Sequence, residues 1–195
     1  MRGRLLAVAA LAALLLTGCT PDSASTTPDD VAGQNYQSGD GSTTLWKVAD
    51  RTGPLDLAGT DFAGAAQDVA DWRGDVVVLN TWYAECPPCR AEAADLVALS
   101  TDYAPDGVKV LGINRQDDAG TAQAFERQFE VPYPSIADTD GAAIAALQGT
   151  VPVNAVPTTV VLDRSGMVAG RILGIADPST LRSIVDDLLA EQPAS

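Results

Sequence analysis

The apolar positions of the chain fall into short blocks that predict strands alternating with helices. Val76–Asn80 and Val108–Asn114 are apolar runs without regular polar alternation, as expected for strands at the centre of a sheet that is covered on both faces. Between these runs, apolar positions recur at helical spacing from Cys89 to about Tyr103. The pattern therefore predicts a strand, a helix and a second strand at the start of a layered α/β domain.

The second half of the chain predicts another helix and then a β-hairpin. Asp117 or Asp118 can cap a helix that runs to about Phe129, and a short helix is expected before Gly149. Two further apolar runs follow, joined by a polar turn that contains glycine, and this arrangement is typical of a hairpin. They are Asn154–Leu162 and Met167–Leu173.

The last predicted helix has a clear start and a clear buried stripe. Asp177 can act as its N-cap and Pro178 fits its first position. The apolar stripe consists of Leu181, Ile184, Val185 and Leu188. Together these elements predict an α/β fold with a central mixed β-sheet flanked by helices.

The N-terminal residues 1–18 predict a targeting segment rather than part of the fold. Two arginines are followed by the apolar run Leu5–Leu16, which is too short for an ordinary membrane span. The run ends in Thr-Gly-Cys at Cys19, which resembles a bacterial lipoprotein signal whose cysteine is lipid-modified and becomes the new N-terminus. An ordinary secretory signal and an uncleaved anchor are the alternatives, and each leaves the domain outside the cytoplasm.

Composition predicts a tether and then one domain. Residues 19–44 are rich in Ser, Thr, Asp, Gly and Pro and lack apolar periodicity, so we expect a disordered tether there. Residues 45–192 suit a single domain with one core.

Charge limits the partners of the chain. It has 12 basic and 26 acidic residues, a net charge of −14, which becomes −16 without residues 1–18 because they hold two arginines and no acid. This excess argues against nucleic acid and anionic lipid headgroups as partners. Histidine is absent from the sequence, which excludes His-based triads and many metal sites. We therefore expect no metal and no cofactor.

The chemistry of the chain centres on Cys86-Pro87-Pro88-Cys89, where a strand ends and a helix begins. Unpaired N–H groups and a partial positive charge in the first helical turn favour a thiolate. Cys86 falls at the N-cap and should be exposed, whereas Cys89 lies on the buried stripe behind it. Pro87 and Pro88 fit the first helical positions. This spacing predicts thiol–disulfide exchange.

Two structural readings of the cysteine pair are weaker. A disulfide across so short a loop constrains little of the unfolded chain, so it adds little to the stability of the fold. A zinc site would need two more ligands, but Cys19 is the one other cysteine and the sequence has no histidine.

Several segments together resemble the membrane-tethered thiol-disulfide oxidoreductases of the TlpA and ResA-like group, in the thioredoxin superfamily. The resemblance covers nearly all of residues 50–190, and the segments that carry it are Val76–Glu92 with the CPPC sequence, Asp138–Gly141, Val156–Thr159 and Leu162–Gly166. It implies a thioredoxin fold with an N-terminal extension and a helical insertion at about 115–131. It also implies a cis peptide bond at Pro157, beside the cysteines.

The resemblance implies roles for individual residues. Cys86 would attack a substrate disulfide, Cys89 would resolve the mixed disulfide, and Glu92 would assist proton transfer. The expected substrate contacts are Trp82, Pro87, Pro88, Val156 and Pro157. A solvated acid in the first turn is the alternative for Glu92, and core packing is the alternative for Trp82.

The chain departs from the family pattern before the first cysteine, and it also has Ala93-Ala94 where the family has an apolar-Pro pair. Glu85 stands where the family usually has Trp before the first cysteine. A carboxylate there would disfavour the Cys86 thiolate and could select basic substrates, unless it is plain surface charge.

The expected function is that of an extracytoplasmic, lipid-anchored protein-disulfide oxidoreductase. The resemblance favours a reductant of protein disulfides, for example in cytochrome c maturation, with a membrane electron donor of the CcdA type. We expect a monomer. A thiol peroxidase is an alternative on the same fold, although Cys86 lacks the upstream Pro and Thr that resemble a peroxidatic site. A non-catalytic binding module of the thioredoxin fold is the third possibility.

Overall fold

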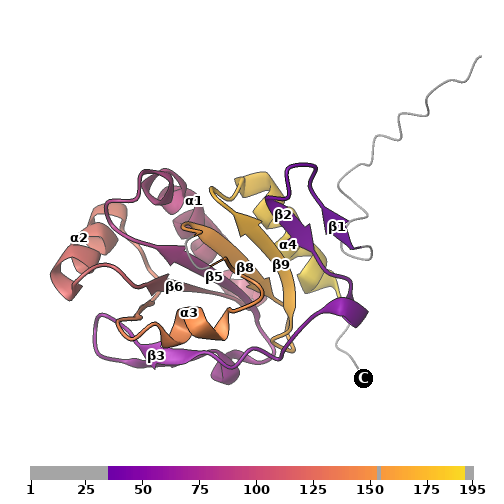
Figure 1. Ribbon diagram of the computed structural model, residues 1–195, viewed down its shortest axis with the longest axis horizontal. Helices are drawn as coiled ribbons and strands as arrows, with labels where there is room; N and C mark the ends of the chain where they lie inside the picture. Colours follow the sequence, from indigo (N-terminus) through magenta and orange to yellow (C-terminus); the bar gives the residue numbers. More distant parts are fainter. Residues whose placement is uncertain (1–34, 153–154, 192–195) are drawn as a thin grey trace, which may run out of the picture.

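The computed structural model describes residues 35–152 and 155–191, which are built on a seven-stranded mixed sheet (Figure 1). Its strands are β1 (Tyr36–Gln37), β2 (Thr43–Leu45), β5 (Val76–Trp82), β6 (Val108–Asn114), β7 (Ser135–Ala137), β8 (Thr158–Leu162) and β9 (Val168–Leu173). Their order across the sheet is β1-β2-β9-β8-β5-β6-β7. β5 pairs in parallel with β6 and antiparallel with β8, so the predicted mixed sheet is confirmed. A separate two-stranded sheet joins β3 (Ala58–Thr60) to β4 (Ala66–Asp68).

Helices cover both faces of the large sheet. They are α1 (Pro87–Tyr103), α2 (Ala119–Phe129), α3 (Ala142–Ala146) and α4 (Pro178–Ala190). One core cluster joins Val76 and Val78 of β5 to α1 and α4, and another joins Val77 and Leu79 of the same strand to α3. Because successive side chains of a strand point to opposite faces, a strand between two helical layers is apolar throughout.

The predicted helix starts are confirmed, with one distinction. Asp177 accepts the N–H of Thr180 at 2.9 Å at the start of α4, whose predicted stripe is buried. Asp118, not Asp117, caps α2 by accepting the N–H of Thr121 at 2.8 Å. α2 lies between β6 and β7, within the helical insertion predicted at about residues 115–131.

The predicted limits of the tether are wrong at their C-terminal end. We expected disorder through residue 44, but residues 36–37 and 43–45 form β1 and β2, which extend the sheet beyond β9. Leu45 is buried in the core cluster that contains α4, and the Leu173 N–H donates to the Ser42 carbonyl at 2.8 Å. These contacts hold residues 36–45 against the sheet, although this segment has no apolar periodicity of its own.

The membrane-directed predictions concern the N-terminal residues. Residues 1–18 and Cys19 lie outside the described residues. Within residues 35–152 and 155–191, no helix combines the length and the apolar character needed to cross a bilayer.

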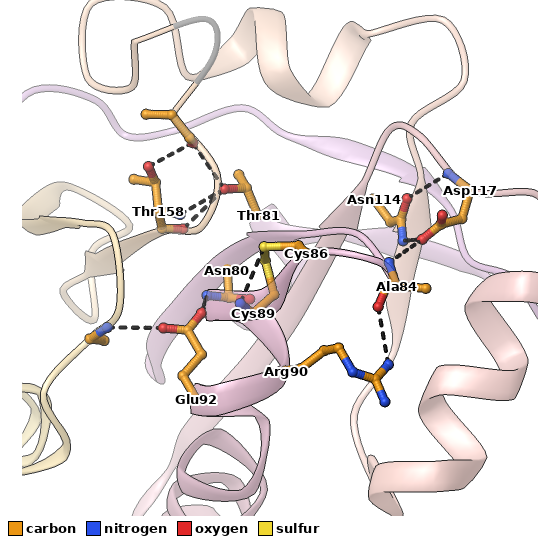
Figure 2. The surroundings of a disulfide bond; sticks show 12 residues. Asn80, Thr81, Ala84, Cys86, Cys89, Arg90, Glu92, Asn114, Asp117 and Thr158 are labelled. Atoms are coloured by element: carbon orange, nitrogen blue, oxygen red, sulfur yellow. Dashed lines mark hydrogen bonds between the residues drawn. A yellow bond between two sulfur atoms is a disulfide. The ribbon is translucent and has the colours of Figure 1, made fainter.

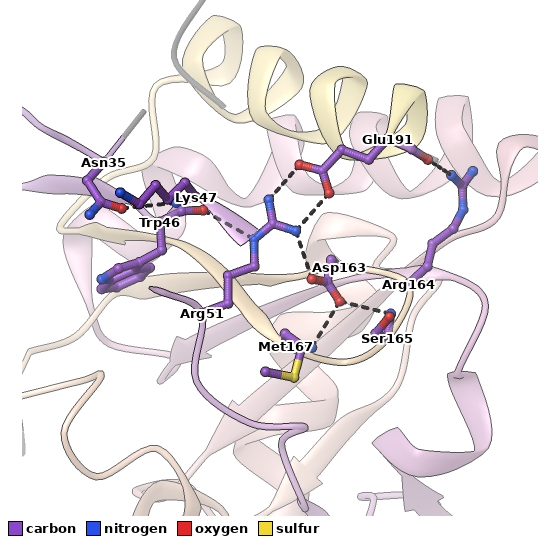
Figure 3. Close-up of polar contacts among 9 residues, drawn as sticks. All are labelled: Asn35, Trp46, Lys47, Arg51, Asp163, Arg164, Ser165, Met167 and Glu191. Atoms are coloured by element: carbon purple, nitrogen blue, oxygen red, sulfur yellow. Dashed lines mark hydrogen bonds and ion pairs between the residues drawn. The ribbon is translucent and has the colours of Figure 1, made fainter. Parts of the chain in front are cut away.

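A buried arginine ties the beginning of the domain to its end (Figure 3). Nη1 of Arg51 donates to Oδ2 of Asp163 at 2.8 Å and to Oε2 of Glu191 at 2.7 Å. Its Nη2 donates to Oε1 of Glu191 at 2.5 Å. The Arg51 side chain is only 2% exposed, so this cluster joins three distant segments inside the protein.

Candidate active site

The two cysteines form a disulfide at the junction of β5 and α1. The Cys86 Sγ–Cys89 Sγ distance is 2.04 Å. Cys86 is the N-cap of α1, and its Sγ accepts the N–H of Cys89 at 3.2 Å (Figure 2). Pro87 and Pro88 occupy the first helical positions, as predicted. This donor in the first turn faces the sulfur that would carry negative charge after reduction.

The predicted exposure of Cys86 is wrong for this disulfide form. Cys86 is 1% exposed and Cys89 is 2% exposed. Both belong to an apolar cluster with Trp82 and with Phe125 of the inserted helix α2, and Val156 packs against this cluster. Exposure of Cys86 was the prediction because the N-cap residue of a helix is usually accessible to solvent. Two segments distant in sequence cover it here.

A loop that contains a cis proline lies beside the disulfide and is held there by hydrogen bonds. The Val156–Pro157 peptide bond is cis, as the resemblance implies. Oγ1 of Thr81 accepts the N–H of Thr158 at 2.8 Å, and Oγ1 of Thr158 donates to the carbonyl of Ala155 at 2.9 Å. These bonds, drawn in Figure 2, attach the proline loop to the end of β5 and bring Val156 to the cysteine cluster.

Glu92 is a buried carboxylate with two hydrogen-bond donors, so its interpretation as a solvated acid is wrong. It is 1% exposed. Its Oε1 accepts from Nδ2 of Asn80 at 2.8 Å, and its Oε2 accepts from the N–H of Ala176 at 2.9 Å (Figure 2). Burial raises the pKa of Glu92, although these two hydrogen bonds oppose the shift.

Asn80 connects this carboxylate to the cysteines. It lines one small cavity together with Cys89, and its Nδ2 also donates to Oγ1 of Thr159 at 3.2 Å. We did not assign Asn80 a role from the sequence. The signal was available, because Asn80 is a polar residue in a strand that is otherwise apolar up to that point.

The inserted segment holds the loop that precedes Cys86. Oδ2 of Asp117 accepts the N–H of Ala84 at 2.6 Å and Nδ2 of Asn114 at 2.8 Å. Nη1 of Arg90 donates to the carbonyl of Ala84 at 3.1 Å. The Arg90 guanidinium also lies 5.1 Å from the ring centroid of Phe129 on α2. Both backbone polar groups of Ala84, two residues before Cys86, are therefore fixed by side chains, which the sequence did not predict.

The remaining predicted site residues differ in accessibility. Trp82 is 6% exposed and its ring centroid lies 4.4 Å from that of Phe125, so core packing accounts for most of its surface. Pro87 and Glu85 are exposed, and Pro88 is half-buried. Their contacts with a substrate stay a prediction, as do those of Val156 and Pro157. No group of His, Cys, Asp and Glu side chains suited to a metal ion occurs in the described part of the chain.

A cleft of about 420 Å³ opens beside the site, at the carboxyl ends of β5 and β6. It is lined by Thr81, Trp82, Tyr83, Ile113, Arg115, Gln116, Ile144 and Val156.

Comparison with known proteins gives one family and several similar proteins. Residues 50–171 match the AhpC/TSA family. The thiol:disulfide interchange protein HelX of Rhodobacter capsulatus is 32% identical over 122 residues, which are 62% of this chain and 65% of HelX. The chain thus spans slightly less than two thirds of this relative.

Two solved structures are similar over more of the chain. A secreted thiol-disulfide isomerase from Corynebacterium glutamicum has a TM-score of 0.70 and 30% identity, covering 81% of this chain and 98% of its own. A thiol:disulfide interchange protein of the thioredoxin family from Chlorobium tepidum has a TM-score of 0.67 and 26% identity, covering 72% of this chain and 97% of its own.

Proposed function

The chain belongs to the AhpC/TSA family and has a thioredoxin fold, and from this premise we propose that it is a protein-disulfide oxidoreductase that works through Cys86 and Cys89. One observation carries the proposal. The disulfide lies at the first turn of α1, beside the cis-proline loop and close to a buried carboxylate. A disulfide between residues only three apart adds little stability. Its position therefore favours a redox-active disulfide over a structural one.

The proposed exchange follows from these positions. In the reducing direction, the Cys86 thiolate attacks one sulfur of a substrate disulfide, forms a mixed disulfide and releases the other substrate sulfur as a thiolate. Cys89 then loses its proton and attacks the Cys86 sulfur. This step releases the second substrate thiolate and forms the Cys86–Cys89 disulfide. The substrate gains two electrons and the protein loses two.

Glu92 is the proposed acceptor of the Cys89 proton. A buried carboxyl with a raised pKa takes up a proton more readily than a solvated one. Asn80 donates to this carboxylate and lines a cavity with Cys89, so both groups lie close to the resolving cysteine. The Asn80 and Ala176 donors hold the carboxylate in one orientation.

We also propose a location and a direction for the reaction. Cys19 would carry the lipid anchor, which would hold the domain, as a monomer, at the extracytoplasmic face of the cell membrane. The domain would reduce protein disulfides, as in cytochrome c maturation, and would receive electrons from a membrane donor of the CcdA type. The sequence of residues 1–19 and the resemblance to the ResA-like group support this part of the proposal.

The test is the reduction potential of the Cys86–Cys89 couple in the full chain. The protein is equilibrated with dithiothreitol or glutathione buffers, and free thiols are counted by alkylation. A value close to that of thioredoxin, about −270 mV, is expected for a reductant that needs an electron supply. A value close to that of DsbA, about −120 mV, would instead indicate a disulfide donor and contradict the proposed direction.

Two further measurements separate the other functions. Steady turnover of hydrogen peroxide by the reduced chain would indicate a thiol peroxidase. Full function in the cell for the double variant Cys86→Ser, Cys89→Ser would indicate a non-catalytic binding module.

A further inference from the structure

The cleft beside the disulfide has an apolar part of its wall that continues into the apolar cluster around the cysteines. Trp82 belongs to that cluster, and Tyr83 and Val156 pack against it. All three also line the cleft, together with Ile113 and Ile144. A polypeptide attached to Cys86 would therefore have this cleft as a neighbouring surface. Thr81, Arg115 and Gln116 add polar groups to the wall of the cleft. A concave surface that combines apolar contacts with placed polar groups is typical of a binding site.

One cation lines this cleft. Arg115 follows the last residue of β6, and the turn around it is fixed because Oδ1 of Asn114 accepts the N–H groups of Gln116 and Asp117, both at 3.0 Å. The Arg115 guanidinium lies near Gly141, where an added Cβ would be 3.6 Å from Nε. Arg115 is exposed, and among the described residues it has no hydrogen bond or ion pair.

The acidic side chains close in sequence to Arg115 or to its neighbour Gly141 accept hydrogen bonds from other groups, and none of them forms an ion pair with Arg115. Asp117 accepts from Ala84 and Asn114. Asp138 accepts the N–H groups of Ala143 at 2.8 Å and Ile144 at 3.0 Å, and Asp140 accepts that of Ala142 at 3.0 Å. Arg115 is therefore an exposed cation without an ion-pair partner among residues 35–152 and 155–191, in a chain whose net charge is −14.

We infer that this cleft is a substrate subsite in which Arg115 binds an Asp or Glu side chain close to the substrate cysteine. The inference rests on the proposed function and adds the substrate class to it. A guanidinium can hold a carboxylate through two parallel N–H···O bonds, and the apolar walls would cover a neighbouring aliphatic or aromatic residue. Glu85, which could have selected basic substrates, is not among the residues that line this cleft.

The test uses peptides with one disulfide that differ only by Glu or Gln, placed in turn one to three residues on either side of the first cysteine. Exchange with the full chain is followed from both redox states by acid quenching and chromatography. At one position, the Glu peptide should react about five-fold faster than the Gln peptide, as expected for a partly exposed ion pair. Added salt should reduce this ratio.

Two variants with the same change in charge identify the residue responsible. Arg115→Gln should bring the Glu-to-Gln ratio close to one. Lys109→Gln, near the other end of β6, should keep the wild-type ratio because Lys109 does not line the cleft.

The outcomes separate the two proposals. Equal rates for all peptides in the wild type, or a Glu preference that persists in Arg115→Gln, would overturn the subsite and leave the proposed function intact. A chain that exchanges with none of the peptides would overturn both.

Discussion

At the scale of single residues, the unusual group is Glu92, a carboxylate with 1% exposure near a disulfide. Its two oxygens accept from Asn80 and Ala176, which come from different parts of the chain. A buried carboxylate in so apolar a region needs such donors if it is to ionise at all. The side chain is therefore held in one orientation and remains able to take a proton.

Replacing Glu92 should affect one chemical step more than the other. In Glu92→Gln, attack by Cys89 on the mixed disulfide should slow by roughly 100-fold, the lower range for a positioned proton acceptor, because the amide cannot take the proton. Formation of the mixed disulfide by Cys86 should change much less. Stopped-flow measurement of both steps tests this. The control is Glu85→Gln, which changes an exposed carboxylate in the loop before Cys86, and equal rates for both variants would contradict the assigned role.

The same carboxyl should make stability depend on pH. Burial raises the pKa of Glu92 above its ordinary value of 4.5, so the folded protein holds this proton more tightly than the unfolded chain. Stability from the protonated form is present below pH 4.5 and is lost as the pH rises through the folded value.

Urea unfolding of the oxidised protein between about pH 4 and pH 8 measures this effect. The free energy of unfolding of the wild type relative to Glu92→Gln should fall as the pH rises from 4.5. A difference that stays constant across this range would show that Glu92 titrates alike in the folded and unfolded states.

At the scale of elements, the junction of β5 and α1 carries the disulfide, and the inserted segment completes it. Asp117 precedes α2 and accepts the N–H of Ala84, while Arg90 of α1 donates to the carbonyl of the same residue. Phe125 of α2 covers the cysteine cluster. The insertion therefore positions the loop before Cys86 as well as extending the fold.

Removing the Asp117 carboxylate should loosen this junction. Asp117→Ala leaves the Ala84 N–H without its acceptor, so the free energy of unfolding should fall by about 2 kcal/mol, the range for a hydrogen bond to a charged group. Asp117→Asn retains an oxygen acceptor and should lose less. Urea unfolding at neutral pH compares the variants, and equal losses for Ala and Asn would contradict this account.

The elements differ in how far sequence could predict them. The bounds of α1 and β6 and the capped start of α4 follow from local signals, namely proline at a first turn, an Asp cap and an unbroken apolar run. β1 and β2 have only two and three residues, and their pairing with β9 is long-range. The burial of Cys86 and Glu92 likewise depends on segments far away in sequence. Local sequence patterns therefore do not predict it.

At the scale of the whole molecule, the cluster of Arg51, Asp163 and Glu191 joins the entrance of the domain, the hairpin turn and the end of α4 (Figure 3). Asp163 also accepts the N–H groups of Ser165 and Met167, at 2.8 and 3.0 Å. One guanidinium thus compensates two partly buried carboxylates that belong to separate elements.

Replacing Arg51 should weaken the entire domain. Arg51→Met leaves two carboxylates without their cation, and the free energy of unfolding should fall by roughly 3 kcal/mol, as for other broken buried pairs. The matched control is Lys47→Met, which removes an exposed pair with Asp50 at 3.4 Å and should cost less than about 1 kcal/mol. If urea unfolding shows similar losses of unfolding free energy in the two variants, the buried Arg51 cluster contributes no more to stability than an exposed ion pair.

The central position of β5 also has a consequence for amide hydrogen exchange. Every residue of β5 is buried, and the strand is hydrogen-bonded to β6 on one side and to β8 on the other. Its amides should exchange with deuterium only when the whole domain opens, whereas those of the exposed strand β1 exchange through local fraying. Opening a path to the sulfur atoms is then a task for the short loops around residues 84–86 and 155–157, above a sheet that stays closed.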